Sequence, residues 1–423
     1  MNLKTQFFKS RFVVHLAVIL IFIVQFSTCY AQKLTIKKSI EQNRKGEIII
    51  KAKPASIVNI EQISHEFWFG CAVSDQLFNG SVSDYNVKMY KEKFLENFNS
   101  AVTENAVKWA NMERKKGEVK YLGIDAILDW AEANSIPIRG HNLFWGVTEN
   151  VQPWVKELSD VELEQTLKNR AETLTARYRG RFVEYDLNNE MVHGNYYEDR
   201  LGANITGKMA QWAKIGDPDI KLFLNDYDIL TGVKLKEYLA QIRLLLKQGI
   251  PLAGIGVQGH LHAETFDRNQ LKNALDSLAQ FQLPIRITEF NMPGQGSKYY
   301  TNSNLKLTPV QEEMKAKELV DYYKICFAHP AVTGIIMWGF WEGANWIPAS
   351  SLYKKDWTPT PAAYAYRNLI YHQWWTNEKV KTNKKGEFSI PAFYGKYKVT
   401  VDGNTKEINL TKVNGKVVVE FKN

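Results

Sequence analysis

The chain alternates between short apolar runs and longer segments whose apolar residues recur at helical spacing. Eight of the short runs read as buried strands. They span residues 67–73, 99–103, 137–145, 182–187, 221–224, 254–257, 284–288 and 334–338. The intervening segments carry charges on the face opposite the apolar one and are predicted as helices. They include residues 85–98, 123–134, 161–178, 233–248, 270–282 and 309–327, with 361–372 as the last helix.

This regular alternation predicts an α/β fold, a (β/α)8 TIM barrel over residues 67–373, with an open doubly wound sheet as the alternative. The flanks have a different pattern, because their apolar residues alternate with period two between Gly and Asn turns. We therefore expect a small β-module, formed by an N-terminal β-region, residues 32–66, and a C-terminal segment, residues 374–423. Being small, the module is expected to pack on the barrel.

The first 31 residues resemble a secretory signal peptide. Three cationic residues precede an apolar run at 12–26, and small or polar residues follow up to Ala31, near which we expect cleavage. The run is shorter than the ~20 residues that a membrane span requires, so no span is predicted. The protein is expected to be secreted, or to lie at the cell surface or in the periplasm. A lipoprotein cysteine at Cys29 is an alternative in a poor sequence context.

Composition limits the possible classes of protein. With 423 residues, 45% hydrophobic and 13% aromatic, the chain has ample material for one large core. Removing residues 1–31 lowers the net charge from +9 to +6, and the lysines are dispersed, so we expect no nucleic-acid partner. Cys71 and Cys326 are expected to be buried thiols rather than a disulfide, and no spacing predicts a metal site. We expect a monomer without cofactors.

Two glutamates stand where predicted strands end. Glu289 follows the run at 284–288, and Glu190 follows the run at 182–187. In a parallel barrel the carboxyl ends of the strands form the active face, and two facing carboxylates suit glycoside hydrolysis. A single acidic residue at the end of a strand is more often a solvated loop anchor than a catalyst, so Glu289 needs a partner. Other strand ends contribute amides, histidines and aromatic rings, which suit a sugar, namely His141, Trp145, Asn225, Tyr227, Gln258, His260, Trp338 and Trp346.

With these motifs the sequence resembles glycoside hydrolase family 10, the endo-β-1,4-xylanases. The matching segments occur in the family's order between about residues 67 and 372. They are 103–109 (TENAVKW), 139–145 (RGHNLFW), 185–190 (YDLNNE), 224–227 (LNDY), 254–261 (GIGVQGHL), 287–289 (ITE) and 338–346. The flanks and the segment VQPW at 151–154 are similar to the plant-type branch of that family.

The resemblance implies a retaining double displacement with Glu190 as acid/base and Glu289 as nucleophile, about 5–5.5 Å apart. It also implies that Asn189 holds the sugar 2-hydroxyl and that His260 hydrogen-bonds the nucleophile, with Gln258 nearby. Because Glu190 lies close to a second carboxylate, its pKa is expected to be raised.

The resemblance also assigns the glycone side of the site, which is the part that binds the sugar whose anomeric carbon is attacked. The residues that match it are Glu104, Asn105, Lys108, His141 and Trp145, with Trp338 and Trp346 closing over the sugar. Each has another interpretation. Glu104 and Lys108 stand four apart and could pair on a surface helix. The tryptophans could fill the core, and Asn225 and Tyr227 could support the site without touching the sugar.

Two positions depart from the family pattern. Gly146 and the residues after it replace the usual His and Gln that follow Trp145, which changes one polar wall of the site. Asn291 stands where the family usually has Asp, so it can accept a hydrogen bond from His260 but brings no charge. We expect this second departure to move the acidic side of the pH–rate profile.

The sequence therefore predicts a secreted endo-β-1,4-xylanase that acts on xylan or a related cell-wall polysaccharide. A weakly active or inactive glycan-binding protein on the same barrel is one alternative, supported by Gly146 and Asn291. A retaining β-glucanase is another, which the wall formed by Glu104, Asn105 and Lys108 disfavours. A purely structural wall protein would leave the two strand-end glutamates unexplained.

Overall fold

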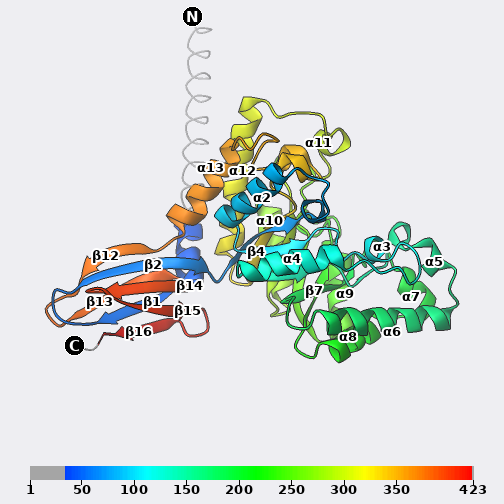
Figure 1. The fold of residues 1–423 in the computed structure, drawn as a ribbon, viewed down its shortest axis with the longest axis horizontal. Helices are drawn as coiled ribbons and strands as arrows, with labels where there is room; N and C mark the ends of the chain where they lie inside the picture. The colour runs from blue at the N-terminus through cyan, green and yellow to red at the C-terminus, as the bar shows by residue number, and fades with distance from the viewer. Residues whose placement is uncertain (1–33, 422–423) are drawn as a thin grey trace, which may run out of the picture.

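The computed structural model describes residues 34–421, which form a barrel with a smaller β-module beside it (Figure 1). The predicted signal peptide and Cys29 lie outside the described residues. Eight parallel strands form a closed ring, as the alternating pattern predicts. The strands are β3 (Trp68–Val73), β4 (Ser100–Thr103), β5 (Ile138–Gly140), β7 (Glu184–Asn189), β8 (Lys221–Asn225), β9 (Leu252–Val257), β10 (Ile285–Phe290) and β11 (Val332–Met337).

The third predicted strand, residues 137–145, is interrupted. Its first part, β5, pairs with both β4 and β7 and closes the ring, whereas β6 (Phe144–Trp145) pairs with the end of β7. Between them the backbone leaves the ladder, and the amide of His141 donates to Thr103 Oγ1 at 3.0 Å. The interruption lies at the carboxyl end of the ring, where His141 and Trp145 line a pocket.

Helices cover the outside of the ring (Figure 1). The main ones are α2 (Asp84–Asn97), α4 (Leu122–Ala133), α6 (Asp160–Arg177), α8 (Ile205–Gly216), α9 (Leu235–Lys247), α10 (Arg268–Ala279), α12 (Pro309–Ala328) and α13 (Pro361–Asn368). The pattern did not predict α8, whose two glycines weaken the helical signal. A π-helical turn, Leu369–Gln373, extends α13. No helix within residues 34–421 is long and apolar enough to cross a membrane.

The β-module is a sandwich of two sheets built from both flanks of the chain, and its strands are antiparallel except for the β1–β16 pair. One sheet contains β1 (Lys45–Lys51), β13 (Glu387–Phe393) and β16 (Lys416–Glu420), and the other contains β2 (Ile57–His65), β12 (Asn377–Lys381), β14 (Gly395–Val401) and β15 (Asn404–Leu410). The pairing of N-terminal with C-terminal strands agrees with the predicted module. However, residues 34–44 are helical, so the N-terminal β-region begins later than predicted.

Arg44 joins the module to the barrel. Arg44 immediately precedes β1 in the chain. Its guanidinium donates hydrogen bonds to the carbonyl oxygens of Phe327, His329 and Val332 at 2.5 to 2.7 Å. It also lies 4.8 Å from the ring centroid of Phe67. These carbonyls lie at the end of α12 and at the start of β11. The buried side chain of Arg44 therefore fixes the module against the barrel where these two elements meet.

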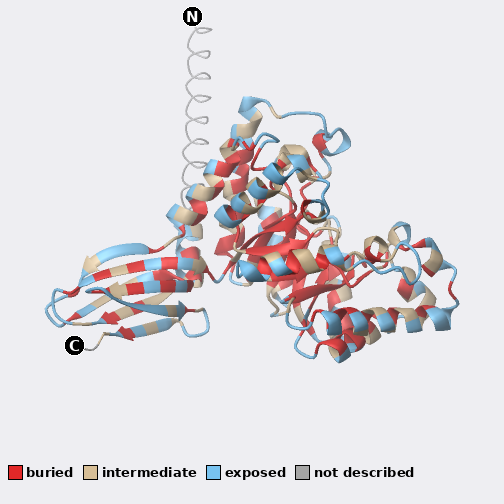
Figure 2. Ribbon diagram, in the orientation of Figure 1, coloured by how far each residue is buried: buried red, intermediate tan, exposed pale blue. Residues whose placement is uncertain are grey.

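The strands of the barrel are largely buried (Figure 2). Among the apolar residues of the barrel lies a charged network. Arg139 on β5 is fully buried and pairs with Glu184 Oε1 at 2.5 Å and with both carboxylate oxygens of Asp186. Arg286 on β10 donates to both oxygens of Glu184 at 3.1 and 3.2 Å. Burial alone would raise the pKa of Glu184, but the two guanidinium groups outweigh it and lower that pKa.

Removing Arg139 is expected to destabilise the fold strongly. Arg139→Met leaves Asp186 without its buried cation, so we expect the free energy of unfolding to fall by about 3–5 kcal/mol. Urea denaturation at neutral pH measures this loss. Arg181→Met, which breaks ion pairs with the exposed Asp129 and Glu132, is the control and should cost less than about 1 kcal/mol. Equal losses in the two variants would contradict a special role for the buried network.

Candidate active site

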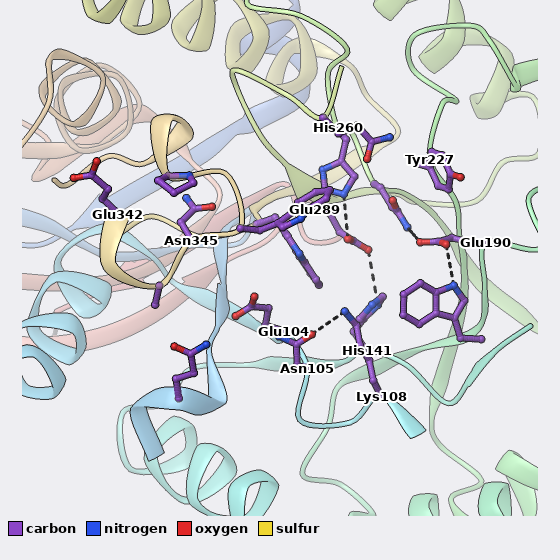
Figure 3. Close-up of a pocket in the computed structure, with 18 of the residues that line it drawn as sticks. Glu104, Asn105, Lys108, His141, Glu190, Tyr227, His260, Glu289, Glu342 and Asn345 are labelled. Atoms are coloured by element: carbon purple, nitrogen blue, oxygen red, sulfur yellow. Dashed lines mark hydrogen bonds and ion pairs between the residues drawn. The ribbon is translucent and has the colours of Figure 1, made fainter. Parts of the chain in front are cut away.

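A pocket of about 730 Å³ opens at the carboxyl ends of the barrel strands (Figure 3). Its size suits a bound sugar chain. Twelve of the fifteen predicted site residues line it, namely Glu104, Asn105, Lys108, His141, Trp145, Glu190, Tyr227, Gln258, His260, Glu289, Trp338 and Trp346. The other three, Asn189, Asn225 and Asn291, are buried behind the wall. Sequence reasoning did not single out Gln76, Gln295, Glu342 or Asn345, which also line the pocket.

Glu289 lies near the carboxyl end of β10 and is almost fully buried. Its Oε1 accepts a hydrogen bond from Asn225 Nδ2 at 2.8 Å, and its Oε2 lies 3.3 Å from His260 Nε2. Burial alone would raise the pKa of Glu289, but the attraction of His141 and the hydrogen bond from His260 lower it to about 2. Glu289 is therefore held as a carboxylate at neutral pH.

Glu190 follows β7 directly and has a positive φ of 60°, which turns its side chain out of the strand direction. Gln258 Nε2 donates to its Oε1 at 2.7 Å, and Trp145 Nε1 donates to its Oε2 at 2.8 Å. Both donors favour the carboxylate. Burial and the nearby charge of Glu289 outweigh them and raise the pKa of Glu190. The two glutamates thus have pKa values shifted in opposite directions.

Asn225 supports the site from behind. It is 1% exposed, donates to Glu289 and to Asn189 Oδ1, and accepts from Thr288 Oγ1 at 2.6 Å. Of the two alternatives for Asn225, the structure favours the supporting one. Asn189, next to Glu190, keeps a buried Nδ2 without a hydrogen-bond partner among the described residues.

His141 connects the pocket to the charged network of the barrel. Its Nδ1 lies 2.9 Å from Asp186 Oδ2 and 3.8 Å from Glu289 Oε1. Asp186 is in turn held by Arg139. Asp186 lies within the predicted motif at 185–190, but only its distance to His141 shows that it holds the imidazole in place.

Glu104, Asn105 and Lys108 lie in the loop after β4, so they do not form a surface helix pair. Lys108 Nζ donates to Asn105 Oδ1 at 2.9 Å and lies 5.2 Å from the ring of Trp145. Burial raises the pKa of Glu104, although Lys108 and a hydrogen bond with Ser74 oppose it. The three side chains form a polar wall on one side of Glu289 (Figure 3).

Tyr227 forms the opposite end of the pocket and lies on His193. Their rings are 3.6 Å apart and almost parallel, with an interplanar angle of 12°. His193 Nδ1 is 2.7 Å from Asp226 Oδ1, and its Nε2 is 3.7 Å from Asp228 Oδ2. Burial alone would lower the pKa of His193, but these carboxylates raise it to about 9. No sequence signal identified His193, because its contribution to the pocket is to support the ring of Tyr227 by stacking.

The two tryptophans predicted to close over the sugar differ in their exposure. Trp338 is 6% exposed and lies edge-on to His141, so it fills space below the pocket as well as lining it. Trp346 is 38% exposed and lies edge-on between His260 and Tyr300. Trp346 is therefore an accessible aromatic surface at the rim, which a sugar face can contact.

The two departures from the family pattern have different local settings. Gly146 packs against the loop after β7, where a Cβ would approach Tyr197 and Gly194 at 3.2 and 3.3 Å. No side chain of residues 146–149 lines the pocket. Asn291 Oδ1 lies 2.7 Å from His260 Nδ1, which donates the bond, and its Nδ2 donates to Ser350 Oγ. Asn291 therefore orients His260 as predicted, without adding charge.

Within residues 34–421, no group of three or more His, Cys, Asp or Glu is arranged to hold a metal ion. Cys71 and Cys326 are free buried thiols, as predicted.

Comparisons with known proteins concern the family of the chain. The family model "Glycosyl hydrolase family 10" matches residues 59–369. Endo-1,4-beta-xylanase 1 of Arabidopsis thaliana is 32% identical over 86% of this chain and 37% of its own length. Anti-sigma-I factor RsgI6 of Acetivibrio thermocellus is 33% identical over 86% of this chain and 45% of its own. The chain thus spans less than half the length of these curated relatives.

A solved structure extends the comparison to the fold. Native xylanase 10B from Thermotoga maritima superposes with a TM-score of 0.63 at 25% identity, covering 73% of this chain and 96% of that one. The match of the family model covers most of the barrel and includes Glu190 and Glu289. The chain therefore belongs to glycosyl hydrolase family 10.

Proposed function

We propose that this chain is a secreted endo-β-1,4-xylanase that cleaves xylan with retention of configuration. The observation that carries the proposal is the opposite shift of two pKa values in one pocket, lowered for Glu289 and raised for Glu190. One group is then a carboxylate and the other can keep its proton, which is the division of labour in retaining glycosidases. Xylan as the polymer is supported by the similarity to the xylanases of Arabidopsis thaliana and Thermotoga maritima.

In the first step, Glu190 donates its proton to the glycosidic oxygen while a carboxylate oxygen of Glu289 attacks the anomeric carbon. The C–O bond to the leaving sugar breaks, and a covalent glycosyl-enzyme forms. In the second step, Glu190, now ionised, takes a proton from water, and the water oxygen displaces Glu289. Asn225 and His260 hold the nucleophile throughout.

The wall of Glu104, Asn105 and Lys108 favours xylan over a β-glucan. A glucose unit carries a hydroxymethyl group that xylose lacks, and this group would crowd the polar wall beside Glu289. The weakly active binding protein remains the second candidate, since Asn291 brings no charge to His260. It has the same pocket, so only catalysis separates it from the enzyme.

The nucleophile can be tested directly. Glu289→Gln should lower the release of reducing sugar from glucuronoarabinoxylan by more than about 10³-fold, because the covalent step is lost. Glu149→Gln, which changes an exposed glutamate at the same end of the barrel, is the matched control and should stay active. For the unmodified enzyme, NMR should show the β-anomer as the first product, and mixed-linkage β-glucan should be cleaved far more slowly.

The same assay decides between the candidates. A folded protein that is retained by xylan in an affinity gel but releases no sugar would support the binding protein. Preferred cleavage of β-glucan would support the glucanase. An α-anomer as the first product would contradict retention.

The hydrogen bond from Gln258 to Glu190 predicts that replacing Gln258 changes the pH dependence of kcat/KM. Its N–H stabilises the Glu190 carboxylate, so Gln258→Met should raise the pKa of Glu190 further. Glu190 must be protonated in the first step, and the basic limb of kcat/KM should therefore move to higher pH. Gln295→Met is the control, because Gln295 lines the pocket without a hydrogen bond to Glu190. A basic limb that moves to lower pH in Gln258→Met would contradict the assignment of Glu190 as the acid.

A further inference from the structure

A second cavity adjoins the pocket at one end. It shares the wall residues Glu342 and Pro348 with the main pocket and extends toward the start of α12. Figure 3 shows Glu342 and Asn345 at the side of the main pocket away from Glu190 and Tyr227. Because the acid protonates the leaving sugar, the leaving side lies toward Tyr227. The second cavity therefore lies at the opposite, glycone end.

This cavity, which we name the lysine pocket, contains three lysines and two carboxylates. Lys306 forms an ion pair with Glu342, whose other oxygen accepts from the backbone N–H of Lys355 at 2.8 Å. Burial opposes the charge of Glu342, but the hydrogen bond from Lys306 and the backbone N–H lower its pKa. Glu342 is thus a neutralised anion on the wall between the two cavities.

Lys315 is the buried member of the set. It is 4% exposed, lies 2.8 Å from Glu312 Oε2, and donates to the carbonyl oxygens of Ala349 and Ser351. These bonds fix the loop between β11 and α13 that separates the cavities. The second carboxylate, Glu312, is therefore also paired.

Lys354 carries the remaining charge. It is exposed on the rim, and among the described residues no hydrogen bond or ion pair engages its ammonium group. Leu307, Pro348 and Tyr353 supply an apolar wall beside it. A net positive cavity with an apolar wall suits a sugar ring that carries a carboxylate.

We propose that the lysine pocket binds a uronic acid branch of the polysaccharide, carried by a backbone sugar at the glycone end of the main pocket. The backbone lies in the main pocket, and the branch passes over the shared wall at Glu342. Lys354 and Lys306 then face the carboxylate of the branch. This proposal rests on the proposed xylanase function and adds a preference for acidic substituents.

The test compares glucuronoxylan with the same polymer after chemical reduction of its carboxylates. The branches then keep their size but lose their charge. The unmodified enzyme should show a kcat/KM about three- to five-fold higher on the native polymer, as expected for one or two exposed charge pairs. The ratio should fall toward one in 1 M salt.

Two variants assign the preference to this cavity. Lys354→Met should bring the ratio close to one. Lys306→Met should bring it to one or below, because it leaves the Glu342 carboxylate unneutralised. Lys317→Met, an exposed lysine of α12 outside the cavity, should keep the ratio of the unmodified enzyme. Thermal unfolding of each variant checks that the fold is intact.

The outcomes separate this inference from the function on which it rests. Failure of the unmodified enzyme to cleave linear xylohexaose would contradict the xylanase function itself. Cleavage of xylohexaose, with equal rates on native and reduced polymer, would contradict only the lysine pocket. A preference that survives in Lys354→Met and Lys306→Met would place the recognition of the branch elsewhere.

Discussion

Arg139 and its two carboxylate partners connect the barrel core to the chemistry of the pocket. The guanidinium is fully buried, so its pairing with Glu184 and Asp186 must be complete to offset desolvation. Asp186 Oδ2, which also accepts from Arg139 Nε, holds His141 Nδ1, and His141 lies 3.8 Å from Glu289. The charge state of Glu289 thus depends on a network anchored on β5, β7 and β10. Stability and function are linked there by direct contacts.

The opposite behaviour of the two glutamates follows from their partners. Both are deeply buried, so burial alone would raise both pKa values. Glu289 is surrounded by imidazole and ammonium groups, whereas the donors to Glu190 are the uncharged Gln258 and Trp145. Charged partners overcome desolvation and neutral ones do not. The strand positions bring both carboxylates to one pocket, and the residues around each of them decide which one is ionised.

The sequence predicts the eight strands and most helices because apolar periodicity reports burial directly. It also places Glu190 and Glu289 at strand ends, and the ordered family motifs around them distinguish them from ordinary loop anchors. It does not predict α8, where glycines dilute the pattern, or the mostly exposed edge strand β12. The stacking of His193 on Tyr227 and the supporting position of Asn225 depend on distances between separate loops and strands, and periodicity carries no information about those.

The contacts around Asn291 separate the geometric effect of an Asp at this position from the effect of its charge. The function of an Asp at this position has two parts, orientation of His260 and electrostatic support of its protonated form. Asn291 keeps the first part, because its Oδ1 holds His260 Nδ1 at 2.7 Å while Ser350 fixes its amide. Asn291 does not supply the second part, but His141 and Lys108 independently favour the ionised form of Glu289. Ionisation of Glu289 therefore has several sources, and losing one of them changes its pH dependence more than its geometry.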